Sequence, residues 1–144
     1  MRLWHKDLIS VLPKNQLIGQ WRECCAIAKA IAENNTPNHI LVNRIMDFPL
    51  EHFLRYTELI QIEMNNRGYH ADLAKFYRFF GPASETIPCN LLNIVKYSNL
   101  FSSWHNDRYL KQCYYNLQEK FDCGGISEEE WIKIKNKFEE KLNK

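Results

Sequence analysis

The stretch that decides the fold is PKNQLIGQWRECCAIAKAIAE, residues 13–33. Its apolar residues recur at spacings of three and four, which is the period of one face of an α-helix: Leu17, Trp21, Cys24, Ala28 and Ile31. Pro13 stands where the first turn of a helix tolerates proline, and Asn34-Asn35-Thr36-Pro37 ends the pattern. The spacing therefore predicts a helix from Pro13 to about Glu33.

The same periodicity predicts three further helices. One runs from about Pro49 to Arg67 and is closed by Gly68, the usual residue of a left-handed C-terminal cap. Another runs from about Asp107 to Phe121. The last begins with Ser127-Glu128-Glu129-Glu130, which has the pattern of a capping box. Residues 69–106 are less regular, although residues 91–97 could form a short helix.

The composition supports a small helical protein. A length of 144 residues fits one domain. The hydrophobic fraction of 45% predicts a real core, and only five Gly and five Pro argue against a turn-rich all-β fold. We expect an all-α fold, a compact single-domain bundle over residues 1–144 with a long N-terminal helix. Residues 1–121 would form the core, and residues 126–144 would form an appended C-terminal helix.

Charge and cysteine usage exclude several classes of protein. A formal net charge of +2 does not by itself indicate nucleic-acid binding. No stretch of 18 residues lacks charge, and the N-terminus has no apolar signal-peptide run, so we expect no membrane contact. The five cysteines include no Cys-x-x-Cys pair, which predicts neither a disulfide framework nor a zinc site. We expect a cytoplasmic protein, near the nucleoid in a bacterium or inside the host cell of a virus.

Glu23 stands on the first helix outside its apolar stripe. Small residues share its face, and polar residues border it: Gly19, Ala26 and Ala30, then Arg22, Gln16 and Gln20. A mid-helix glycine costs about 0.5–1 kcal/mol relative to alanine, and close approach of another backbone or a ligand is one use of that cost. A solvated helix face with a tolerated glycine is the other interpretation.

The N-terminus offers a second reactive group. Arg2 is too large to favour removal of the initiator methionine, so we expect Met1 to remain. An α-amine is generally a better nucleophile near neutral pH than a lysine, because its ordinary pKa is about 7.7–8.0 against about 10.4. The five histidines share no metal-ligand spacing, so we expect no metal site.

Several of these residues form a recognisable set. Arg22-Glu23 on a first helix, shortly after Arg2, resembles the pyrimidine-dimer DNA glycosylases typified by the phage enzyme called endonuclease V. The likeness continues to Arg67-Gly68-Tyr69 at the end of the second helix. Residues 1–5, 16–23 and 109–120 are similar to short bacterial and viral relatives of that enzyme.

The resemblance implies a DNA repair glycosylase with AP-lyase activity and no cofactor. Met1 matches the residue whose α-amine is the nucleophile, and Glu23 matches the essential carboxylate. Four positions match DNA-contacting residues of the family: Arg2, Arg22, Gln16 and Lys120. The implied partner is double-stranded DNA with a pyrimidine dimer or another damaged base, and we expect a monomer.

This chain also departs from the family pattern. The family enzyme has histidine where this chain has Gln16, and arginine where it has Ala26 and Asn116. Fewer phosphate contacts predict weaker DNA binding with a shallower salt dependence. The aromatic C-terminal tail of the phage enzyme is not recognisable here. Two alternatives therefore stay open: a non-catalytic nucleic-acid-binding or protein-interaction module on the same scaffold, and acid/base chemistry on a small molecule at Glu23.

Overall fold

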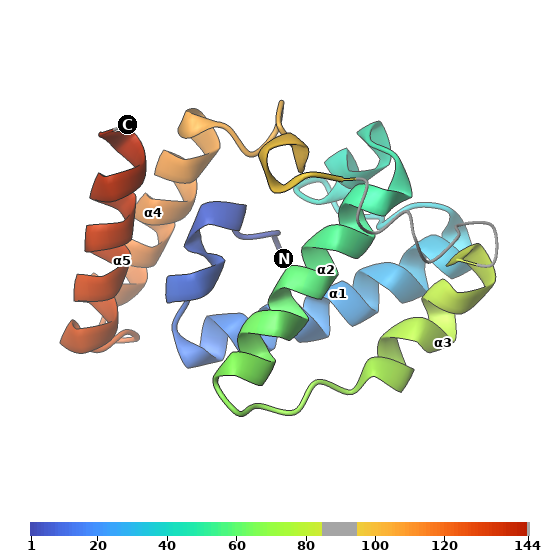
Figure 1. Cartoon of the computed structure of the whole chain (residues 1–144), viewed down its shortest axis with the longest axis horizontal. Coiled ribbons are helices and arrows are strands. Elements are labelled where there is room, and N and C mark those ends of the chain that lie inside the picture. Colours follow the sequence, from blue (N-terminus) through green and yellow to red (C-terminus); the bar gives the residue numbers. More distant parts are fainter. Residues whose placement is uncertain (85–94, 144) are drawn as a thin grey trace.

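The computed structural model describes residues 1–84 and 95–143, and the regular structure of this part is helical, without strands (Figure 1). The all-α prediction is thus confirmed. The long helices are α1 (Lys14–Asn34), α2 (Leu50–Asn66), α3 (Leu73–Ser84), α4 (Asp107–Asp122) and α5 (Glu128–Leu142). Short 3-10 helices lie between them: η1 (Lys6–Val11), η2 (Asn43–Asp47) and η4 (Tyr97–Asn99).

The helix ends follow the caps that the sequence predicts. α1 begins directly after Pro13. Gly68 closes α2 with φ +80°, and its N–H donates to the carbonyl of Asn65 (3.0 Å). At the start of α5 the Ser127 hydroxyl accepts from the Glu130 N–H (3.2 Å), and the Glu130 carboxylate accepts from the Ser127 N–H (3.2 Å). Local hydrogen bonds therefore fix these boundaries.

Helix α3 is a regular element within residues 69–106, which the sequence predicts to be less regular. It begins after Asp72, whose carboxylate accepts from the Lys75 N–H (3.2 Å) as an N-terminal cap. Phe76 is 1% exposed and packs against Trp21 and Phe53, with ring centroids 6.0 and 5.9 Å apart. A short helix over residues 91–97 is not tested as a whole, because residues 91–94 lie outside the described residues; Tyr97 begins η4.

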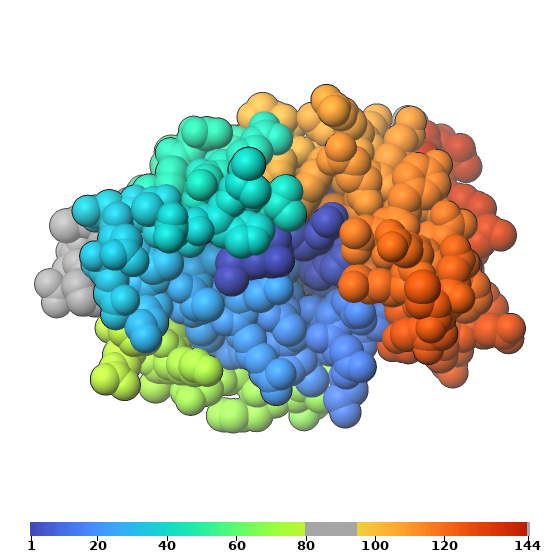
Figure 2. Space-filling model, turned by 180° about the vertical axis from the view of Figure 1, so that it is seen from behind, coloured from blue at the N-terminus to red at the C-terminus, as the bar shows by residue number. Residues whose placement is uncertain are grey.

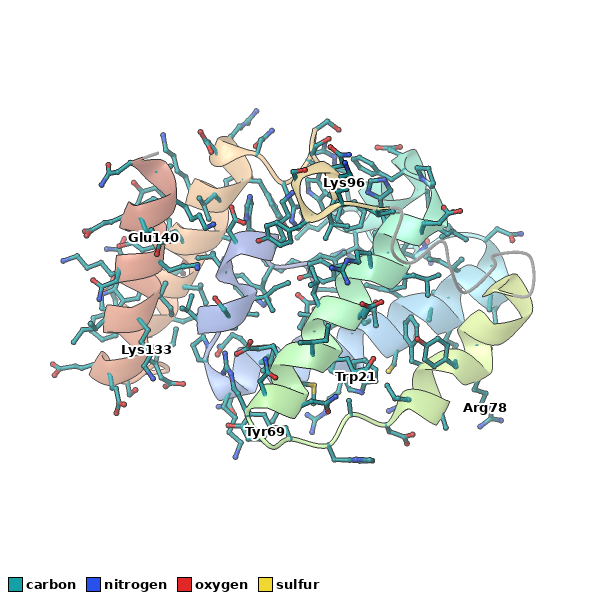
Figure 3. All side chains as sticks on the ribbon, in the orientation of Figure 1. Trp21, Tyr69, Arg78, Lys96, Lys133 and Glu140 are labelled. Atoms are coloured by element: carbon teal, nitrogen blue, oxygen red, sulfur yellow. The ribbon has the colours of Figure 1, made fainter. Side chains whose placement is uncertain are left out.

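One continuous core joins α1, α2 and α3 to η1, α4 and α5, and includes Leu8, Leu117 and Ile134. The apolar stripe predicted for α1 faces it: Leu17, Trp21, Cys24, Ala28 and Ile31 are all buried. Helices α4 and α5 lie side by side at one end of the molecule, with η1 between them and α2 (Figure 1). Figure 3 shows Trp21 among the helices and Lys133 and Glu140 on α5.

Aromatic rings join α5 to α4. Tyr114 stacks on Phe138 with ring centroids 3.8 Å apart and planes 4° apart. Trp131 stacks on Phe121 at 5.1 Å. Because α5 also contacts η1, the C-terminal helix supports the segment that follows the N-terminus.

Within the described residues, no helix combines the length and hydropathy that crossing a bilayer would need. Cys24, Cys25 and Cys113 are buried and Cys123 is exposed, and all four are free thiols. Cys89 lies outside the described residues.

Candidate functional site

The first residues of the chain lie against α1 and end beside Glu23. The Trp4 N–H donates to Gln20 Oε1 (2.8 Å), and Gln20 Nε2 donates to the Arg2 carbonyl (2.9 Å). The Arg2 N–H in turn donates to Glu23 Oε2 at 3.4 Å. Successive polar groups of one helix thus hold the N-terminal segment in place, with residue 1 next to the Glu23 carboxylate.

The α-amine of Met1 is therefore within a short reach of that carboxylate. The chain spans at most about 3.6 Å per residue, so the amine nitrogen lies no more than about 7 Å from Glu23 Oε2. Met1 is 44% exposed and Glu23 is half-buried. An amine and a carboxylate so placed could share a proton through one water or act on the same bound atom.

Gln20 links the two groups, and the sequence interpretation had placed it only at the border of the Glu23 face. It is 1% exposed, and its Nε2 lies 3.4 Å from Glu23 Oε2 as well as donating to Arg2. Trp4 N–H can only donate and the Arg2 carbonyl can only accept, which fixes the orientation of the amide. Its position could have identified it, because residue 20 is three residues after Leu17 and four before Cys24 on the core side.

Two tyrosines, the buried Tyr56 and the half-buried Tyr109, hold the remaining carbonyls of the segment. The Tyr56 hydroxyl donates to the Trp4 carbonyl (2.6 Å), and the Tyr109 hydroxyl donates to the Leu3 carbonyl (2.5 Å). Burial raises the pKa of both phenols, so both stay protonated and can donate. The carbonyls of three consecutive residues are thus held by side chains from α1, α4 and α2.

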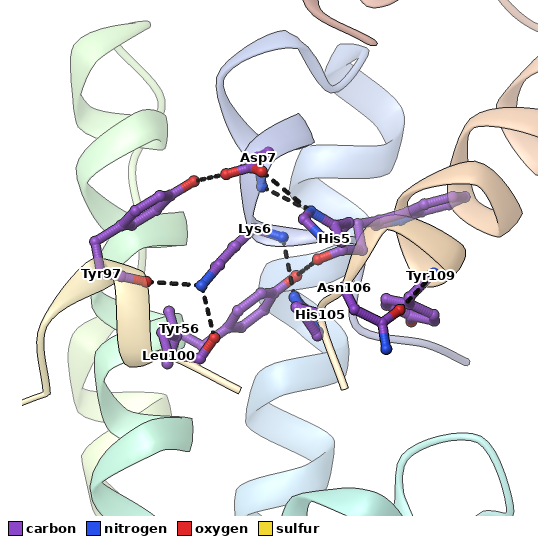
Figure 4. A network of polar contacts seen from close by, with 10 residues as sticks. His5, Lys6, Asp7, Tyr56, Tyr97, Leu100, His105, Asn106 and Tyr109 are labelled. Atoms are coloured by element: carbon purple, nitrogen blue, oxygen red, sulfur yellow. Dashed lines mark hydrogen bonds and ion pairs between the residues drawn. The ribbon is translucent and has the colours of Figure 1, made fainter. Parts of the chain in front are cut away.

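A second polar network anchors the following residues (Figure 4). The Lys6 N–H donates to His105 Nδ1 (3.0 Å), and the Lys6 ammonium donates to the carbonyls of Tyr97 (2.7 Å) and Leu100 (2.9 Å). The Tyr97 hydroxyl donates to the Asp7 carboxylate. These bonds tie the start of the chain to the segment before α4, which restricts how far the N-terminus can move.

This network predicts a pH-dependent stability. His5 and His105 are 2% and 4% exposed, and burial lowers the pKa of His5 below 6.5 and that of His105 well below it. The unfolded chain binds these protons near the ordinary pKa of about 6.5, so acid favours unfolding. We expect the free energy of unfolding to fall below pH 6.5 by up to about 1.4 kcal/mol per pH unit for each histidine held neutral.

Urea unfolding at pH 7, 6 and 5 measures this effect. His105→Gln keeps an acceptor for the Lys6 N–H and removes one titrating group, so its stability should depend less on pH than that of the wild type. Equal pH dependence in the two proteins would contradict the assignment.

The other predicted site residues lie at different distances from the contact between Arg2 and Glu23. Arg22 is exposed beside Glu23, and half-buried Gln16 precedes Glu23 by about two turns of α1. Lys120 is exposed in the last turn of α4, about 12 Å along the helix axis from Gln112, the residue of α4 that lines a pocket together with Arg2 and Tyr109. The structure thus brings Arg2 and Glu23 into contact, and places Lys120 on a separate part of the surface.

Packing within the protein does not require a glycine at position 19. A Cβ at this position would meet no atom within 4 Å, so the N-terminal segment does not need a glycine here in order to approach α1. Ala26 on the same face is exposed. The small-residue face beside Glu23 is therefore open on its outer side.

A pocket of about 390 Å³ opens beside the N-terminal segment, within the usual size range of ligand sites. In Figure 2 the N-terminal residues lie at the centre of this face, between the α1–α2 connection and α4. The walls of the pocket combine two cations, two aromatic rings, two aliphatic side chains and an amide: Arg2, Arg44, Trp104, Tyr109, Ile40, Leu41 and Gln112.

The two arginines of this pocket lie over aromatic rings. Arg2 Cζ is 5.1 Å from the Trp4 ring centroid, and Arg44 Cζ is 5.6 Å from that of Trp104. Among residues 1–84 and 95–143, no group of three or more His, Cys, Asp or Glu side chains could hold a metal ion.

Comparison with known proteins gives one match. A family model of pyrimidine dimer DNA glycosylases matches residues 1–76, a segment that includes Arg2, Arg22 and Glu23 and ends within α3. No curated protein and no solved structure matches the chain. Because the match covers more than half of the sequence, the chain belongs to the pyrimidine dimer DNA glycosylase family.

Proposed function

We propose that this protein is a DNA repair glycosylase with AP-lyase activity, in which the Met1 α-amine is the nucleophile and Glu23 the acid/base. Pyrimidine dimers are the first expected substrate, and other damaged bases or abasic sites are also considered. The observation that carries the proposal is the hydrogen bond from the Arg2 N–H to Glu23 Oε2, because it sets residue 1 beside the carboxylate. Family membership supports the same reaction class.

The glycosylase step begins with the neutral amine. Its lone pair forms a bond to C1′ of the damaged nucleotide, while the bond from C1′ to the base breaks and the base leaves with that electron pair and takes up a proton. Glu23 accepts a proton from the attached nitrogen and delivers one to the ring oxygen O4′ as the C1′–O4′ bond opens. The product is a protonated imine between residue 1 and the opened sugar.

The lyase step follows from the charge of that imine. The cationic nitrogen acidifies C2′, and Glu23 removes a proton from this carbon. The electron pair forms a C2′–C3′ double bond, and the 3′ phosphate leaves with the C3′–O bond electrons, which cuts the strand. A carboxylate beside the nitrogen also stabilises the positive charge of the sugar and of the imine.

The surface around the centre would hold the DNA. Arg2, Arg22 and Gln16 are proposed to contact phosphates near the lesion, and Lys120 to contact the backbone farther along α4. The pocket beside Arg2 would accommodate an extrahelical base against the half-buried ring of Tyr109. Few cations share this work, so binding should be weak and should fall as salt rises.

Covalent trapping tests the proposal. The protein is incubated at low salt with duplexes that carry a pyrimidine dimer or an abasic site, and borohydride is added to reduce any imine. We expect a stable protein–DNA adduct and a strand cut on the 3′ side. A variant with Gly-Ser added before Met1 should give neither, because its amine is displaced from Glu23.

The outcomes separate the alternatives. Binding to damaged DNA without an adduct or a cut would favour a non-catalytic module and overturn the proposed activity. An unchanged adduct in the extended variant would show that another amine is the nucleophile.

A further inference from the structure

The turn between α1 and α2 holds two aliphatic side chains in solvent at the rim of the Arg2 pocket. Ile40 is 84% exposed, more than any other large hydrophobic residue in the described part of the chain, and Leu41 is 49% exposed. A single exposed aliphatic residue is ordinary. Two adjacent ones that line a cationic pocket beside the proposed nucleophile need a reason.

The backbone of this turn is firmly held beneath the two side chains. The His39 N–H donates to Asn43 Oδ1 (3.0 Å), and the Asn43 N–H donates to the His39 carbonyl (2.8 Å). The Leu41 N–H donates to His39 Nδ1 (3.2 Å). Val42 and Ile45, both 0% exposed, anchor the turn in the core. The aliphatic side chains are thus presented outward by a bonded turn.

The surroundings of the turn fit a polyanion with an apolar interior. Arg2 and Arg44 line the same pocket and would attract phosphates, while the half-buried Tyr109 adds an aromatic ring to its wall. Proteins that open a duplex often insert Ile, Leu, Met or Phe between base steps and surround them with cations. Duplex DNA has both features: its phosphates suit the two arginines, and its stacked bases suit the aliphatic side chains.

We propose that Ile40 and Leu41 form a wedge that enters the base stack of duplex DNA at the damaged step and keeps the pair open. The proposal rests on the proposed function, since it concerns how the lesion reaches Met1 and Glu23. The wedge fills the space that the displaced nucleotide leaves, so the stack does not close again before the amine attacks.

The test compares an Ile40→Ala/Leu41→Ala double variant with the wild type. The probe is a duplex that contains a reduced abasic-site analogue with 2-aminopurine opposite, whose fluorescence rises when it is unstacked. We expect the wild type to raise the fluorescence and the double variant to lose most of the rise. Single-turnover cutting of an abasic duplex should slow at least about tenfold.

Two controls separate the wedge from other effects. Ile132→Ala on α5 removes an equally large side chain that is 56% exposed, and should match the wild type in both measurements. Borohydride trapping on a single-stranded abasic oligonucleotide should be unchanged in the double variant, because no stack has to be opened there.

The remaining outcomes overturn either the wedge or the proposed glycosylase and lyase chemistry, and the experiment distinguishes the two. The wedge is overturned if the fluorescence does not rise with the wild type, if the double variant equals the wild type on duplex DNA, or if it loses trapping on single strands as well. Should the wild type trap no DNA while its fluorescence rise still depends on Ile40 and Leu41, the proposed chemistry fails and the wedge stands.

Discussion

Glu23→Gln is expected to lower the rate of covalent trapping by at least about a hundredfold, the usual contribution of a positioned acid/base. Glutamine has the same shape and still accepts from the Arg2 N–H, so the N-terminal segment should keep its place. It cannot take a proton from the amine or from C2′, nor balance the charge of the imine. The loss should therefore be chemical and not structural.

Single-turnover trapping on an abasic duplex measures this loss, and thermal unfolding shows whether the fold persists. Glu33→Gln is the matched control, since Glu33 is an exposed carboxylate near the other end of the same helix. It should trap at the wild-type rate. Trapping by Glu23→Gln at that same rate would show that the carboxylate does not take part.

The second large effect is expected at Gln20. Gln20→Leu removes the partners of the buried Trp4 N–H and the Arg2 carbonyl. An unsatisfied buried group costs about 1–3 kcal/mol, so the variant should lose several kcal/mol of stability and should release the N-terminal segment from α1. Gln61→Leu on α2 is a control with the same substitution at a half-buried position.

Gln20→Glu distinguishes positioning from stability. A carboxylate can still accept from Trp4, but when ionised it has no proton to offer the Arg2 carbonyl and repels Glu23 across the 3.4 Å contact. Relative to the wild type at the same pH, trapping should be weak at pH 8 and recover toward pH 5, where the new carboxyl group regains a proton. A pH profile parallel to that of the wild type would limit Gln20 to a structural role.

Local patterns account for the parts of the fold that could be predicted. The stripe of α1, the Gly68 cap and the Ser127 capping box depend on residues within one or two turns, so the sequence alone indicates them. The same kind of signal was present for α3, because Asp72 caps a segment in which Phe76 follows four residues later. It was missed because no long stripe accompanied it.

The docking of the N-terminus could not be predicted in this way. It depends on Tyr56 and Tyr109, which are 52 and 106 residues away from the carbonyls that they hold. Tyr109 also lies beyond residues 1–76, where the family model ends. Family resemblance identified Met1 and Glu23 as candidates, but their proximity depends on the tertiary structure.

The net charge is a poor guide to nucleic-acid binding, because binding depends on where the charges lie in the folded structure. The total of +2 is a sum over the whole chain, and it is lowered by acidic residues such as Glu128 and Glu129 at the start of α5. The pocket beside the N-terminus contains two arginines, of which Arg44 had drawn no attention in the sequence. Local arrangement of charge therefore says more about a polyanionic partner than the sum does.

Peptide mapping of the borohydride-trapped adduct tests the central claim most directly. Lys6 is the chemical competitor, since burial lowers its pKa, although its ammonium is held by two carbonyls. Trypsin cleaves after Arg2, which lies between the two amines, so they fall on different peptides. The account predicts the sugar remnant on the Met1 nitrogen; a remnant on Lys6 or on any other lysine would contradict it.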